Sequence, residues 1–132
     1  METSRWIQRF ENFNAAFSKL EEAVQKTDLN ELEENGLIQR FEFTVEIAWK
    51  TLRDFLIDQG YQTGTSPKEV FRFAAKEEII QSAEPFFNCL ETRNQLSHDY
   101  SQSKFEASVK HIREDLFPHL KSLRDTLGNH LE

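Results

Sequence analysis

Glycine, proline and cysteine are scarce in this chain, which holds 4, 3 and 1 of them among 132 residues. Sandwiches and barrels of many short strands need turn residues at every connection, so the scarcity disfavours them and favours an all-helical domain. The single cysteine, Cys89, excludes an intrachain disulfide and a cysteine zinc cluster. Nothing therefore points to an oxidising compartment.

Long hydrophobic runs and an excess of positive charge are also missing. No apolar stretch approaches the roughly 20 residues of a membrane helix, and the first residues lack the basic and apolar regions of a secretory signal. We therefore expect no membrane span and a cytoplasmic location. The net charge of −7, from 16 basic and 23 acidic residues, disfavours a broad duplex-binding surface but not a local anion site.

Apolar residues at helical spacing predict one all-α domain over residues 1–132. The 38% hydrophobic content, with 12 Phe, is enough to bury a core at this length. A first helix of about six turns is predicted by one apolar stripe. This stripe consists of Trp6, Phe10, Phe13, Phe17, Leu20 and Val24.

A second helical pattern runs from about Glu33 to Gln59, where Gly60 supplies a left-handed stop. Its apolar arc is unusually wide, because Phe43, Ile47 and Ile57 fall outside the main stripe. Such a helix needs partners on more than one side. We expect either that it is the central helix of the bundle or that it also serves a subunit interface.

Three further helices complete the predicted set of about five. The third begins at the cap Ser66-Pro67-Lys68-Glu69 and runs to about residue 77, and the fourth opens at 82–85. The fifth follows the capping box at 103–106 and ends near Gly128. Pro118 lies inside it and is expected to kink it near Glu114, the residue four positions earlier.

The segment from Arg93 to Tyr100 gathers arginine, histidine, tyrosine, amide and hydroxyl side chains at the predicted end of the fourth helix, a common place for a site. Asn94 and His98 share a helix face. Arg93 and His98 lie about 140° apart on an ideal helix. They converge only if the helix unwinds near Ser97 or if a second subunit completes the pocket.

Histidine can accept and donate protons near neutral pH, and the planar guanidinium of arginine can donate two hydrogen bonds to phosphate oxygens. The pair suits metal-free cleavage of RNA: His98 would take the proton of a ribose 2′-hydroxyl while Arg93 holds the phosphate. The structural alternative remains open. In it, Arg93 pairs with a nearby carboxylate, His98 caps a helix end and Tyr100 anchors a turn.

Three other features favour structural interpretations over chemistry. No HExxH pattern accompanies His111, Asp115 and His119, so we expect a solvated polar face and no metal site. We predict that a second set of charged residues forms an exposed strip on the second helix, in which Glu46 and Lys50 stabilise the helix as an i,i+4 ion pair. This set is Glu42, Glu46, Lys50 and Asp54. Cys89 beside Leu90 is interpreted as a small core residue and not as a nucleophile.

Three segments together resemble a known superfamily: the Phe- and Trp-rich stretch from Gly36 to about Leu56, Ser66-Pro67-Lys68-Glu69-Val70, and Arg93-Asn-Gln-Leu-Ser-His-Asp-Tyr100. They are similar to the HEPN superfamily (higher eukaryotes and prokaryotes nucleotide-binding). More narrowly, the chain resembles the small nucleotidyltransferase substrate-binding proteins, also described as HepT-like toxins. The likeness extends from about Trp6 to Leu123.

The resemblance implies an up-and-down, four-helix-bundle-like homodimer in which the Arg/His motifs of both subunits face one cleft. It also implies a toxin–antitoxin pair: a ribonuclease needing no metal or cofactor, and a minimal nucleotidyltransferase that transfers AMP to the motif tyrosine. Arg93 would then bind RNA phosphate, His98 would act as general acid and base, Asn94 would support the pocket, and Tyr100 would accept AMP. Two alternatives remain, a non-catalytic substrate- or nucleotide-binding subunit of the nucleotidyltransferase and a helical dimer with a structural motif.

Overall fold

The computed structural model describes residues 4–96 and 102–131, with the backbone alone at 102–105. All regular structure in these ranges is helical, as the scarcity of turn residues predicted. The elements are α1 (Arg5–Gln25), α2 (Glu31–Asp58), α3 (Pro67–Lys76), α4 (Glu84–Leu96), α5 (Gln102–His111), the π turn η1 (Ile112–Leu116) and α6 (Phe117–Gly128). None of these helices is long and apolar enough to cross a membrane.

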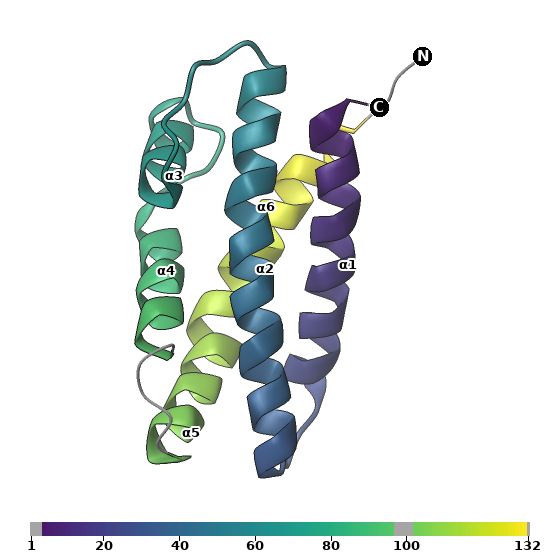
Figure 1. The fold of residues 1–132 in the computed structure, drawn as a ribbon, viewed down its shortest axis with the longest axis vertical. Coiled ribbons are helices and arrows are strands. Elements are labelled where there is room, and N and C mark those ends of the chain that lie inside the picture. The colour runs from purple at the N-terminus through teal and green to yellow at the C-terminus, as the bar shows by residue number, and fades with distance from the viewer. Residues whose placement is uncertain (1–3, 97–101, 132) are drawn as a thin grey trace.

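The helices form an up-and-down bundle with α2 in its middle (Figure 1). α1 runs antiparallel to α2 on one side, and α3 and α4 form a column on the other. The rod made of α5, η1 and α6 crosses behind them, and α2 packs against all five other α-helices. The predicted central position of α2 is confirmed, whereas Phe43, which widened the apolar arc, remains 61% exposed.

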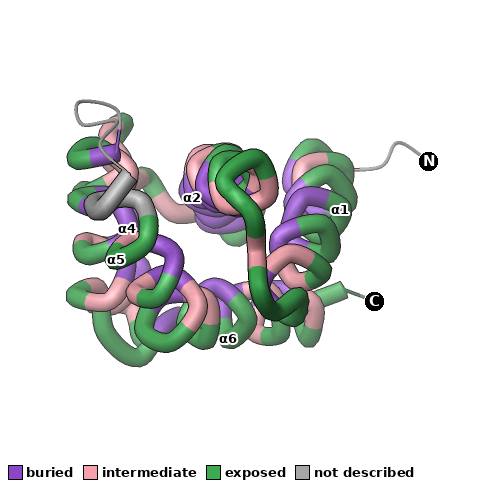
Figure 2. The backbone as a smooth tube through the Cα atoms, turned by 90° about the horizontal axis from the view of Figure 1, so that it is seen from below, coloured by how far each residue is buried: buried purple, intermediate pink, exposed green. Residues whose placement is uncertain are grey.

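The core is built from the predicted stripes. In Figure 2 the buried stretches of the tube lie on the sides of the helices that face one another. All six stripe positions of α1 are buried, from Trp6 to Val24. Trp6 meets Phe55 of α2 edge to face at 5.0 Å, and Phe17 stacks on Phe117 of α6 at 5.0 Å. Burying one such side chain contributes about 1.5–3 kcal/mol, so these rings tie α1 to both neighbours.

Two helix ends follow the sequence signals directly. Gly60 adopts a left-handed φ of 92°, and the N–H groups of Gly60 and Tyr61 donate to the carbonyls of Ile57 and Leu56, both at 3.0 Å. This is the Schellman arrangement that a glycine permits. At the start of α3, the Ser66 hydroxyl accepts from the Glu69 N–H at 3.3 Å. Both predicted ends are confirmed.

Pro118 divides the predicted fifth helix. Proline has no N–H to donate to the carbonyl of Glu114, so the regular α-helical bonding fails there. The chain widens into the π turn η1, in which the Phe117 N–H bonds to the Ile112 carbonyl five residues earlier. The irregularity lies where the kink was predicted, and the π turn is the form it takes.

Candidate functional site

Arg93 lies in the last turn of α4 and reaches across to the middle of α2. Its Nη1 donates a hydrogen bond to Oε2 of Glu46 at 2.8 Å. The two side chains are 22% and 44% exposed, so the pair sits at the surface of the interface between the helices. The ion pair foreseen in the structural interpretation is therefore present. A guanidinium has five N–H donors, so a bond to Glu46 and a phosphate contact are compatible.

Of the other predicted site residues, the structure places Asn94, which is exposed on α4 beside Arg93. His98 and Tyr100 lie outside the described residues, because α4 is described as far as Leu96 and the next described position is 102. The convergence of Arg93 with His98 thus stays a prediction. The described part of the site consists of Arg93, Asn94 and the surface of α2 against which Arg93 packs.

Glu46 is the carboxylate at the centre of this surface. Burial alone would raise the pKa of Glu46, but the neighbouring indole N–H of Trp49, the contact with Lys50 and the positive charges of Lys50 and Arg93 outweigh it and lower the pKa. Lys50 lies 3.2 Å from the carboxylate, which confirms the predicted i,i+4 pair. Glu46 is therefore an anion at neutral pH and holds Arg93 electrostatically.

Asp54, two turns further along α2, corrects the prediction of an exposed strip. It is buried, with 5% exposure. Three arginines surround its carboxylate: Arg9 Nε at 2.6 Å, Arg53 Nε at 3.5 Å and Arg5 Nε at 3.7 Å. The spacing of acidic residues along α2 could not reveal this burial, because Arg5 and Arg9 come from α1 through tertiary packing.

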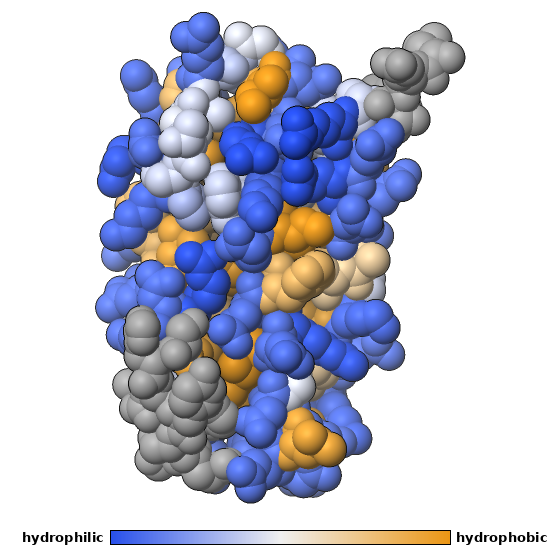
Figure 3. Space-filling view, viewed as in Figure 1, coloured by the Kyte–Doolittle hydropathy of each residue, from blue (hydrophilic) through white to orange (hydrophobic). Residues whose placement is uncertain are grey.

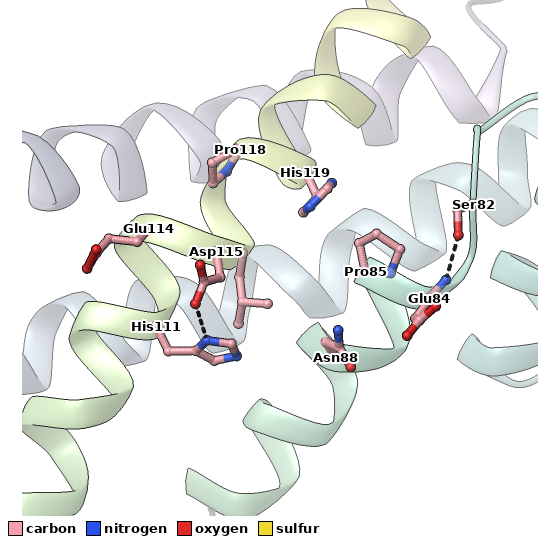
Figure 4. A pocket seen from close by; sticks show the side chains of 10 residues that line it. Ser82, Glu84, Pro85, Asn88, His111, Glu114, Asp115, Pro118 and His119 are labelled. Carbon is pink, nitrogen blue, oxygen red and sulfur yellow. Dashed lines mark hydrogen bonds and ion pairs between the residues drawn. The ribbon is translucent and has the colours of Figure 1, made fainter.

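A hollow of about 540 Å³ lies between the start of α4 and the rod of η1 and α6 (Figure 4). His111 Nδ1 lies 2.8 Å from Asp115 Oδ2 there, and His119 and Asn88 line the same space. In the described part of the chain, no group of three or more His, Cys, Asp or Glu side chains is placed to hold a metal ion. The hollow flanks the first turns of α4, whereas Arg93 lies in the last.

Cys89 is a core residue, as predicted. It is 1% exposed, and burial raises the pKa of its thiol to about 12. The thiolate is the reactive form of cysteine. A thiol with so high a pKa is almost entirely protonated at neutral pH, so Cys89 takes no part in the candidate site.

Large apolar side chains lie exposed on α2 next to Glu46. Phe43 is 61% exposed and, with the half-buried Ile47, lines a hollow of about 780 Å³ between α1 and α2. Figure 3 shows this face, where apolar patches interrupt the hydrophilic surface. Both residues fell outside the predicted stripe. Phe43 precedes Glu46 by three positions on α2, so this apolar surface begins within one helical turn of Glu46.

Comparisons with known proteins agree with the resemblance inferred from the residues. The model of a family described as "Nucleotidyltransferase substrate binding protein like" matches residues 8–129. A crystal structure of a protein from Thermus thermophilus is similar, with a TM-score of 0.76 and 27% identity over 89% of this chain and 97% of that one. No curated protein matches the chain.

Proposed function

Since the chain belongs to the nucleotidyltransferase substrate-binding-like family, we propose that it is a metal-independent ribonuclease, the toxin of a pair whose antitoxin is a minimal nucleotidyltransferase. The observation that carries the proposal is Arg93, a partly exposed arginine held by Glu46 at the end of α4, five residues before His98 in the sequence. A guanidinium group is permanently charged and can donate two parallel hydrogen bonds to the oxygens of an RNA phosphate.

The reaction needs only groups of this chain and the RNA. His98 takes the proton of a ribose 2′-hydroxyl, and the resulting oxygen attacks the adjacent phosphorus. The bond from phosphorus to the 5′ oxygen breaks, and protonated His98 returns its proton to that leaving oxygen, which restores the neutral histidine. Arg93 binds the non-bridging oxygens and stabilises their growing negative charge, while Asn94 supports the pocket.

Modification of Tyr100 provides the switch. Transfer of AMP from ATP to its hydroxyl joins the phosphorus of AMP to the tyrosine oxygen and releases pyrophosphate. The adenylyl group adds bulk and negative charge two residues from His98, where an RNA phosphate must bind. The nucleotidyltransferase thus neutralises the ribonuclease without remaining bound to it.

Two copies of the chain form the complete site in this proposal. On an ideal helix, Arg93 and His98 point in different directions, and a two-fold interface brings the motifs of both subunits to one cleft. The exposed Phe43 and the hollow that it lines between α1 and α2 supply an apolar surface on the helix that carries Glu46. We expect this face of α2 to lie at the subunit interface.

A second candidate function is a non-catalytic subunit that presents a substrate or nucleotide to the nucleotidyltransferase. The description of the matching family, nucleotidyltransferase substrate binding protein like, favours it. In that case Arg93 and His98 contact a ligand and cut nothing. The two functions share one surface and differ in whether the RNA is cleaved.

The decisive experiment incubates purified wild-type, His98→Ala and His119→Ala proteins with a mixed RNA pool in EDTA. His119 is an exposed histidine on α6 and serves as the matched control. Treatment with the cognate nucleotidyltransferase and ATP is the second arm, followed by mass spectrometry of the Tyr100 peptide.

Cleavage by wild type and His119→Ala but not by His98→Ala, abolished as Tyr100 gains the mass of AMP, is the expected result. Failure of all three proteins to cleave, together with tight binding of the nucleotidyltransferase or a nucleotide, would overturn the ribonuclease proposal and support the binding subunit. Cleavage that EDTA abolishes would contradict the metal-independent mechanism.

A further inference from the structure

A row of cations crosses α1 and α2 toward α4. Its members are Arg5, Arg9, Arg53, Lys50 and Arg93. The first three surround Asp54, and the last two both contact Glu46. The guanidinium of Arg53 also lies over the ring of Trp49, 5.2 Å from its centroid, and Trp49 precedes Lys50 in α2. We call these five cations the arginine row.

The arginine row is positively charged in a chain that is acidic overall. Within it, five cations contact two carboxylates, those of Asp54 and Glu46, whereas the chain as a whole carries a charge of −7. Figure 3 shows hydrophilic side chains gathered over the upper parts of α1 and α2 on this face. A local excess of positive charge attracts an anion even where the net charge repels it.

The side chains of the row are held in place before any ligand binds. The Asp54 carboxylate is 3% exposed and receives the Nε–H of Arg9 at 2.6 Å, so it fixes that guanidinium. Trp49 supports Arg53 from one face. Arg5, at the outer end, has a side chain that is 76% exposed. Guanidinium groups fixed in this way lose little side-chain entropy when they bind phosphate.

The length of the row points to a chain of phosphates. Glu46 and Asp54 are eight residues apart on α2, which is about 12 Å along the helix axis. One end of the row is Arg93, the residue assigned to the phosphate at the cleaved bond. The other end, around Asp54, is too far away to contact that phosphate, so a ligand that reaches both ends must carry a second anionic group.

We propose that the arginine row binds the sugar–phosphate backbone of single-stranded RNA that flanks the cleavage site, an inference that rests on the proposed function for the identity of the ligand. A single strand fits a narrow row along one helix, whereas a duplex requires a broad basic surface that a charge of −7 disfavours. A protein partner with an acidic surface could bind the row without reaching Arg93. The row ends at Arg93, which favours a ligand that continues from the cleavage site. The site thus selects RNA that continues beyond the reacting nucleotides.

The test compares Arg5→Glu with Lys121→Glu. Arg5 is the most exposed member of the row, and Arg9 and Arg53 still pair with Asp54 after its replacement. Urea unfolding of both variants checks that they fold before binding is compared. Lys121 is an exposed lysine on α6, which crosses behind α1 and α2 in Figure 1, and its replacement changes the net charge equally. The probe is a fluorescent 2′-O-methyl RNA of about 20 nucleotides, which lacks the attacking hydroxyl and is bound without being cut. Its Kd is measured at several salt concentrations.

We expect Arg5→Glu to weaken binding about fivefold to tenfold and to reduce the slope of log Kd against log salt by about 0.7, the value for one phosphate contact on a single strand. Lys121→Glu should change neither by more than about twofold. Equal effects of the two variants on probe binding would overturn the proposal.

Cleavage of unmodified RNA in the same preparations separates this inference from the proposed function. If wild type cleaves RNA but Arg5→Glu binds the probe normally, the arginine row is overturned and the ribonuclease stands. If Arg5 controls probe binding but no RNA is cleaved, the row is supported as an RNA-binding surface and the ribonuclease proposal fails. An effect of Arg5→Glu on long substrates but not on dinucleotides supports both.

Discussion

The Arg93 guanidinium and the Glu46 carboxylate meet 2.8 Å apart where the end of α4 packs on the middle of α2. This pair orients the side chain that we assign to RNA phosphate, and it also joins two helices of the bundle. Because both side chains remain partly exposed, the pair contributes little to stability, about 1 kcal/mol or less. Its main consequence is the position of Arg93.

Substitution of Arg93 should therefore affect RNA cleavage much more than folding. Arg93→Ala removes the phosphate contact and is expected to lower kcat/KM at least 100-fold, with the unfolding free energy changed by about 1 kcal/mol or less. Arg93→Lys keeps the charge but loses the fork, and it should retain an intermediate rate. Cleavage kinetics and urea unfolding of the same samples measure both effects. A loss of stability that matches the loss of activity would show that Arg93 is only structural.

The lowered pKa of Glu46 predicts a specific dependence of stability on pH. A carboxyl whose pKa is lower in the folded state than its ordinary value of 4.5 stabilises the fold above that value, and the stabilisation is lost as the pH falls through the lowered pKa. Glu46→Gln cannot titrate. The difference in unfolding free energy between wild type and Glu46→Gln should be constant near pH 7 and shrink below about pH 4.5. A difference independent of pH from 7 to 3 would contradict the assignment.

The buried Asp54 should be the most sensitive acidic residue among those described here. Asp54→Asn keeps the shape but removes the charge that three arginines share, and we expect a loss of about 3 kcal/mol in unfolding free energy. Asp125→Asn is the matched control, because that carboxylate is 55% exposed and pairs with Arg124 at the surface. It should change stability by about 0.5 kcal/mol or less. Equal effects of the two substitutions, measured by chemical denaturation, would contradict a structural role for the Asp54 cluster.

Cys89 gives a direct measure of core integrity. With a pKa of about 12 and 1% exposure, its thiol should react with a disulfide reagent such as DTNB only when the chain opens. We expect no measurable reaction of the native protein at pH 8 within minutes and rapid reaction of one thiol in guanidinium chloride. Rapid labelling of the native protein would show that α4 is not packed as described.

Much of the fold could be predicted from the sequence, because the decisive signals are local. The apolar stripe from Trp6 to Val24 matches the buried face of α1, and Gly60 ends α2 in the left-handed conformation. Pro118 marked the irregular turn because proline lacks the N–H that regular helical bonding uses. Each of these features depends on residues within a few positions of one another.

The candidate site was less predictable, because its contacts join residues that are distant in sequence. The motif beginning at Arg93 was found from residue types, but its pairing with Glu46 spans 47 positions. Asp54 was expected on an exposed strip, and the arginines of α1 that bury it come from 45 or more positions away. Spacing along one helix describes only that helix, and the arginine row exists only once α1, α2 and α4 are packed.

The exposed Phe43 tests the expected subunit interface. If two copies meet through this face of α2, a charge there must be desolvated on association, and Phe43→Asp should convert the dimer to a monomer in sedimentation experiments. Leu131→Asp is the control, because Leu131 is also exposed, at 37%, but follows α6 at the other end of the chain. It should leave the dimer unchanged. The Phe43→Asp monomer should keep its helical content and lose RNA cleavage, since each copy alone holds an incomplete cleft. A stable, active dimer of Phe43→Asp would place the interface elsewhere, and a monomer that cleaves RNA at the wild-type rate would show that one chain completes the site.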